Sequence, residues 1–136
     1  MGEARKDDTA GLTIARYVRV AGDSASRRRG LLGVSKIEHG AGLWIAPSEA
    51  IHTFGMKFAI DVVFLDRQFR IRKLVERLRP RRIAVCLSAA SVLELRAGTI
   101  AECHLAVGDS LVFDRERDGY SVSLAVPISS SKCPSH

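Results

Sequence analysis

Apolar residues recur along the chain in short segments with the period of two that is typical of β-strands. Residues 12–20 follow this pattern except at Arg16, so we expect a strand there that could form a sheet edge. Residues 42–46 and 51–56 are expected to be short extended segments. Residues 60–65 (Ile-Asp-Val-Val-Phe-Leu) predict a stronger strand because β-branched residues dominate the segment.

A β-hairpin is predicted where residues 66–68 (Asp-Arg-Gln) form a turn between the strand at 60–65 and a second strand at 69–75. Strict alternation would place three apolar residues of the second strand on one face: Phe69, Ile71 and Val75. The opposite face would then carry Arg70, Arg72 and Leu74.

The remaining elements are read from turn residues and local composition. Pro80 precedes an expected strand at 82–87, and residues 88–96 have a helix-forming composition that would end at Gly98. Asp118-Gly119 predicts a turn between strands at 110–113 and 120–126. N-cap groups after residue 22 predict another short helix at 27–32.

These elements predict a mainly β fold, a small barrel or sandwich of about seven short, mostly antiparallel strands with two short helices. The 136 residues suffice for one domain, which we place at 12–127 between a disordered arm (1–11) and a flexible tail (128–136). The composition, 46% hydrophobic and 26% charged, excludes an intrinsically disordered chain.

Further features limit the compartment and the cofactors. No apolar run approaches the roughly 18 residues of a membrane span, and no leader precedes the first strand. We therefore expect a cytoplasmic protein, or an exported one if a leader had been removed upstream. Cys86, Cys103 and Cys133 lack the spacing of a disulfide or zinc framework, so we predict no metal site and no cofactor.

The net charge of +6 is concentrated in one segment, residues 67–82, where eight basic residues face Glu76 alone. They are Arg67, Arg70, Arg72, Lys73, Arg77, Arg79, Arg81 and Arg82. A stripe of this kind could bind nucleic acid or another polyanion. Because only Phe69 could stack on a base within the segment, we favour a solvated basic hairpin.

Few residues suggest catalysis. A hydrolase could use His52 as a base oriented by Asp61 or Asp109, but the chain shows neither a nucleophile motif nor an oxyanion hole. Asp61 is better explained as a carboxylate that holds a loop, and Glu94 as a solvated or capping acid on the second helix.

Apolar residues near His52 indicate either core packing or the lining of a pocket. They are Trp44, Phe54 and Met56.

Four blocks of residues occur in the order found in a known family. They are Arg27-Arg28-Arg29-Gly30-Leu31-Leu32-Gly33 with Gly42-Leu43; His52 to Asp66; Val92-Leu93-Glu94-Leu95-Arg96-Ala97-Gly98; and Val107-Gly108-Asp109. Over roughly residues 12–113 the chain resembles the domain of unknown function family 192 (DUF192).

The resemblance implies a compact, mainly β domain with no established activity, and it implies export for many relatives. Ala59 stands where the family usually has proline. The polar positions of the family correspond to Arg29, Met56, Asp61, Glu94 and Asp109.

Together these observations favour a non-catalytic module that binds a small molecule, a glycan or a protein, with nucleic acid as the alternative partner. The residues expected to line its site are Arg29, Trp44, His52, Met56, Asp61, Glu94 and Asp109.

Overall fold

The computed structural model describes residues 10–22 and 36–126, and its mainly β architecture confirms the predicted fold class. The predicted helix at 27–32 and Arg29 lie outside the described residues. The described part contains nine strands and one short helix: β1 (Ala10–Ala21), β2 (Ala41–Ile45), β3 (Ala50–His52), β4 (Ile60–Leu65), β5 (Ile71–Leu78), β6 (Ile83–Val85), β7 (Ser91–Arg96), α3 (Thr99–Glu102), β8 (Leu111–Glu116) and β9 (Gly119–Ala125).

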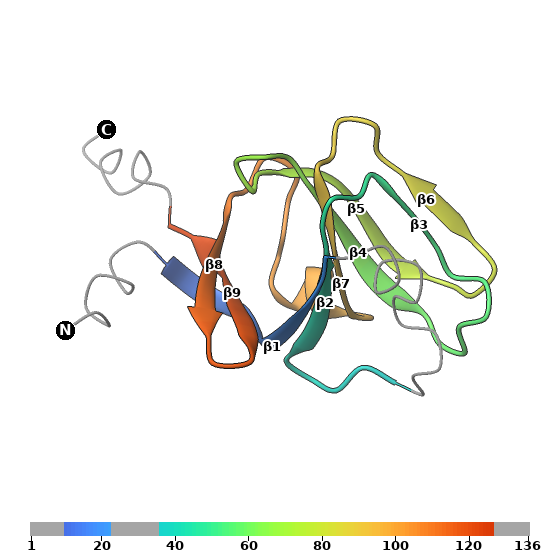
Figure 1. Ribbon diagram of the computed structural model, residues 1–136, viewed down its shortest axis with the longest axis horizontal. Helices are drawn as coiled ribbons and strands as arrows, with labels where there is room; N and C mark the ends of the chain where they lie inside the picture. The colour runs from blue at the N-terminus through green and yellow to red at the C-terminus, as the bar shows by residue number, and fades with distance from the viewer. Residues whose placement is uncertain (1–9, 23–35, 127–136) are drawn as a thin grey trace.

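Seven strands form one curled sheet in the order β5-β4-β7-β2-β1-β9-β8, and β3 pairs with β6 in a separate two-stranded sheet (Figure 1). All pairs are antiparallel except β1 with β2. The edge strands β5 and β8 approach each other at one isolated bridge, Arg70 to Ser110. The fold is therefore sandwich-like, with a strongly curled sheet that does not close into a barrel.

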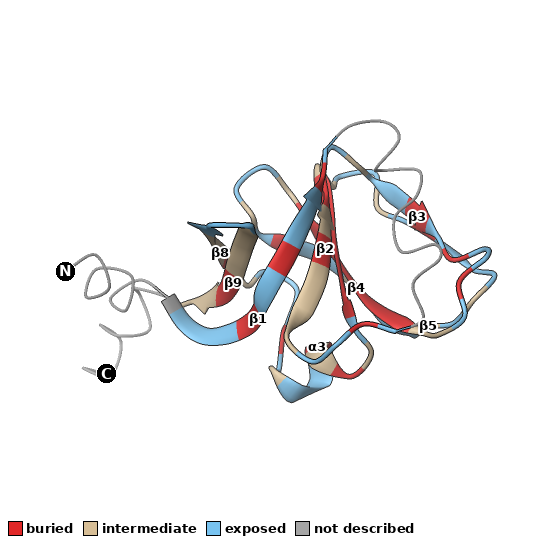
Figure 2. Ribbon diagram, turned by 60° about the horizontal axis from the view of Figure 1, so that its bottom comes forward, coloured by how far each residue is buried: buried red, intermediate tan, exposed pale blue. Residues whose placement is uncertain are grey.

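Two apolar clusters lie on opposite sides of the curled sheet. The inner cluster, on the concave side, includes Val18, Val63, Leu65, Ile71, Leu93, Leu95 and Val122. The outer cluster, between the other side and the β3–β6 sheet, includes Leu43, Ile45, Met56, Ile60, Val62, Phe64 and Val92. Since β4 contributes to both clusters, all its residues are buried, as Figure 2 shows.

The predicted hairpin of β4 and β5 is confirmed, but two irregularities change which way its second strand faces. Leu65 pairs with Ile71 and Phe64 with Lys73, so Arg72 is an extra residue that reverses the alternation. Ile71 therefore belongs to the inner cluster and Val75 packs on the outer one. The prediction that they share a face was wrong because a bulge cannot be read from alternation alone.

The predicted helix at 88–96 was also wrong. Residues of β7 lie between β4 and β2 in the middle of the sheet, and the helix, α3, begins after Gly98 instead of ending there. A strand buried on both faces has no polar alternation, so its helix-favouring composition misled the prediction. Likewise β1 is an interior strand between β2 and β9, not an edge strand.

Candidate functional site

Asp61 holds three parts of the backbone together from the middle of the protein. Its carboxylate is fully buried and accepts hydrogen bonds from the backbone N–H groups of Arg77 (2.8 Å), Gly98 (3.1 Å) and Ile100 (2.8 Å). Arg77 sits at the second irregularity of β5 with a φ of 51°, and Gly98 precedes α3 with a φ of 99°. The loop-holding interpretation agrees with this geometry, since the carboxylate is occupied by backbone donors.

Glu94 lies on β7, the strand next to that of Asp61, and its surroundings are apolar instead of polar. It pairs with Val62 of β4 and Leu43 of β2, two members of the outer cluster, and only 3% of it is exposed. Its Oε1 atom has no hydrogen-bond partner. Burial raises the pKa of this carboxyl from 4.5 to about 7. The prediction that Glu94 is a solvated or capping acid on a helix is therefore wrong, because the residue lies on a central strand.

The expected pocket around Trp44 and Met56 is divided by the curled sheet. Met56 is buried in the outer cluster, whereas Trp44 packs on the inner one. There Trp44 contacts the rings of Phe113 (centroids 4.4 Å apart) and Tyr120 (5.4 Å). The two residues cannot line one pocket, although both are core residues of the fold.

The hydrolase arrangement requires a hydrogen bond from His52 to Asp61 or Asp109, and none joins them in the structure. His52 is exposed on β3, 5.7 Å from the ring of Phe54. Asp109 closes a turn by accepting a hydrogen bond from the N–H of Ala106 (2.9 Å).

Among the described residues, no three His, Cys, Asp or Glu side chains converge as a metal site. None of the described helices is long and apolar enough to cross a membrane.

The basic residues of segment 67–82, which we call the basic segment, are all exposed. None of them forms an ion pair with another described residue. Several border the small sheet: Lys73 donates a hydrogen bond to the carbonyl oxygen of Val85 (2.8 Å), and Arg72 donates one to the hydroxyl of Ser88 (3.3 Å). Arg82 is joined to Thr53 through the backbone (2.8 Å). Three residues of the basic segment therefore lie beside β6 or at its end.

The outer face of the β3–β6 sheet is largely apolar, and His52, the partner of Ile83, is the one polar residue that the two strands place there. Along β6 and the residue positions that follow it, side chains alternate between the core and the solvent. Ala84 is buried, whereas Ile83 (65% exposed), Val85 (39%) and Leu87 (78%) face outward. Phe54, from the loop after β3, is also exposed. We call these four residues the apolar face.

Sequence reasoning missed the apolar face because the run at 82–87 was interpreted only as a strand. The signal was present in the order of sizes: small residues, Ala84 and Cys86, alternate with large ones. Which set faces the core depends on β6 pairing with β3 and packing on the outer cluster, a long-range arrangement that the sequence does not state.

Comparison with known proteins identifies relatives by sequence family and by fold. The family model of DUF192, described as "Uncharacterized ACR", matches residues 5–113. A search of curated proteins finds no significant match.

Two solved structures are similar in fold. A protein of unknown function from Novosphingobium aromaticivorans is 19% identical with a TM-score of 0.64, over 75% of this chain and 80% of that one. A protein of Sinorhizobium meliloti, described as a candidate transcription regulator, is 20% identical with a TM-score of 0.63, over 79% and 80% of the chains. At these identities the likeness concerns the fold alone.

Proposed function

Because the chain belongs to DUF192, a family whose description names no activity, we propose its function from its surface: it is a non-catalytic binding module. It docks a protein whose contact surface is apolar at the centre and acidic at the rim. The observation that carries the proposal is the orientation of β6, which turns its large apolar residues to the solvent and its small one to the core.

An outward apolar face has an energetic consequence. Leaving large aliphatic side chains in water forgoes about 1.5–3 kcal/mol for each one that could be buried. Ile83 and Leu87 are mostly exposed, so covering them with an apolar surface would be favourable. Protein interfaces commonly combine such an apolar centre with a charged rim.

Charge complementarity specifies the partner. Lys73 and Arg72 lie along one side of the apolar face and Arg82 lies at its end. These cations have no described acidic partner within the chain. Acidic residues around an apolar patch would match them, and the apolar face favours such a partner over nucleic acid, whose outer surface is mostly phosphate and sugar.

The test selects peptides from a displayed random library and titrates a synthetic copy of the dominant sequence. We expect sequences that combine Asp or Glu with Leu, Ile or Phe. The double variant Ile83→Ser/Leu87→Ser and the double variant Arg72→Gln/Lys73→Gln should each bind this peptide at least about tenfold more weakly. Val107→Ser is the matched control, because Val107 is similarly exposed (63%) in the loop after α3.

Two outcomes contradict the proposal. The first is equal binding of the selected peptide to the Ile83→Ser/Leu87→Ser variant. The second comes from a salt titration of a labelled oligonucleotide: binding that is lost in Arg72→Gln/Lys73→Gln but kept in Ile83→Ser/Leu87→Ser would assign the basic segment to nucleic acid instead.

A further inference from the structure

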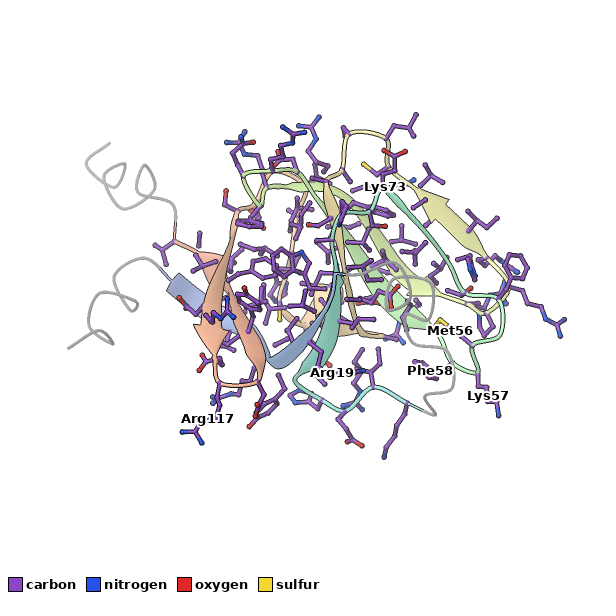
Figure 3. All side chains as sticks on the ribbon, viewed as in Figure 1. Arg19, Met56, Lys57, Phe58, Lys73 and Arg117 are labelled. Atoms are coloured by element: carbon purple, nitrogen blue, oxygen red, sulfur yellow. The ribbon has the colours of Figure 1, made fainter. Side chains whose placement is uncertain are left out.

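We propose a second binding site at the other end of the sheet, where a hollow beside β1 and the β8–β9 turn takes a nucleoside monophosphate or a closely similar ring-bearing phosphate. Arg16, Arg19 and Arg117 would hold the phosphate, and Tyr17 the ring. Figure 3 shows Arg19 and Arg117 on the side of the molecule away from Lys73, so this site is separate from the apolar face.

The hollow has the size of a small-molecule site. Its volume is about 640 Å³, within the range of about 300–1,000 Å³ that such sites occupy. A neighbouring hollow of about 480 Å³ shares Arg19, Arg117 and Tyr120 with it and continues around the same turn. The space is therefore large enough for a ring, a sugar and a phosphate.

Close approach of the turn to β1 creates this arrangement. Gly119 opens β9 with a φ of 145°, and a Cβ atom there would lie 2.2 Å from the carbonyl oxygen of Val18. Only glycine permits this approach, which places Arg117 of the turn beside the side chains of β1.

The charges favour an anion. Arg16, Arg19 and Arg117 are exposed around one hollow, and no ion pair joins any of them to another described residue. The hollow has three guanidinium groups against the carboxylates of Glu116 and Asp118, a net charge of +1, and a bound phosphate would accept charge-assisted hydrogen bonds from the guanidinium groups.

The other lining groups suit the rest of the ligand. Glu116 and Asp118 are carboxylates at the same hollow, and they can accept hydrogen bonds from sugar hydroxyl groups. Glu116 already accepts one from Ser121 (2.9 Å), which fixes its position. A ligand with phosphate alone would leave these acceptors unused and opposed to its charge.

Only one of the two tyrosines at the hollow can stack on the ring of a ligand, because Tyr120 shares the inner face of the sheet with its partner Val18 whereas Tyr17 lies on the opposite face, beside Ala41. Tyr120 is held by its contacts with Trp44 and Phe113, and the guanidinium of Arg115 lies 5.9 Å from its ring centre. Tyr17 is 70% exposed, which leaves its ring available to a ligand. Stacking of a planar base on tyrosine is worth about 1–3 kcal/mol in single-strand nucleic-acid binding, and the same contact is available here.

The experiment measures AMP binding to the full chain by isothermal titration calorimetry, beside adenosine, ribose 5-phosphate and inorganic phosphate. We expect AMP to bind with a Kd below about 1 mM and at least about tenfold more tightly than each of the other three. Arg117→Gln and Tyr17→Ser should each weaken AMP binding at least about tenfold. Arg82→Gln is the matched control, since it removes an exposed arginine of the basic segment.

Three results would overturn the proposal: no AMP binding at about 1 mM, equal binding of inorganic phosphate and AMP, or binding that survives both Arg117→Gln and Tyr17→Ser. Melting temperatures of the variants establish that they are folded. The Ile83→Ser/Leu87→Ser variant should lose binding of the selected peptide but bind AMP as tightly as wild type. The two experiments therefore test this site and the proposed docking function independently.

Discussion

The unpaired carboxyl of Glu94 makes a quantitative prediction about stability and pH. In the folded protein burial raises its pKa to about 7, whereas the unfolded chain should titrate near the ordinary value of 4.5. Below pH 4.5 the group is protonated in both states and causes no loss. As the pH rises from 4.5 to 7 the unfolded chain releases its proton first, so the free energy of unfolding falls.

The size of the loss follows from the two pKa values. One pKa unit corresponds to about 1.4 kcal/mol, so the difference amounts to about 3 kcal/mol, reached near pH 7 and constant above it. This is a large part of the 5–15 kcal/mol that is typical of a domain. The side chain is almost completely buried, so solvent screening reduces the loss little.

Substitution Glu94→Gln separates this contribution from all other titrating groups. The free energies of unfolding of wild type and variant should be measured with urea from pH 4.5 to pH 8.5. We expect the variant to gain about 3 kcal/mol relative to wild type between pH 4.5 and pH 8, because glutamine keeps the shape and cannot ionise. Glu76→Gln is the control, since Glu76 is an exposed glutamate on β5. Parallel profiles for wild type and Glu94→Gln would refute the reasoning.

Substitutions at three further positions test the fold by their effect on the free energy of unfolding. Asp61→Ala should lower it by about 4 kcal/mol or more, because three backbone N–H groups, two of them in buried hydrogen bonds, lose a charged acceptor, while Asp61→Asn should cost less; equal losses would contradict this. Gly119→Ala should cost at least about 2 kcal/mol through the contact with Val18, and a neutral result would mean that the turn moves away freely. Phe64→Ala should cost about 3–5 kcal/mol, as for other fully buried rings, and thermal and urea unfolding should agree on the loss.

Local sequence was sufficient where local and tertiary preferences agree. The strand at 60–65 was predicted correctly because β-branched residues favour a strand and both of its faces are buried. The same two-sided burial concealed β7, whose Ser-Val-Leu-Glu-Leu-Arg sequence is equally compatible with a helix. Its position between β4 and β2 is a property of the whole sheet, so Glu94 was assigned to the solvent although it is in the core.

The candidate site depended even more on long-range pairing. Eight cations in one segment could be counted from the sequence, but the position of Arg72, Lys73 and Arg82 beside an apolar face could not, because that face forms only when β6 pairs with β3 and no other described strand joins their sheet. An apolar run in a sequence is ordinarily interpreted as core, and for Ala84 that is correct. For Ile83 and Leu87 it is wrong, because neighbouring residues of a β-strand point to opposite faces and these two point to the solvent. The register of one short strand pair, β3 with β6, thus determines whether the residues of the proposed docking surface lie in the core or face a partner.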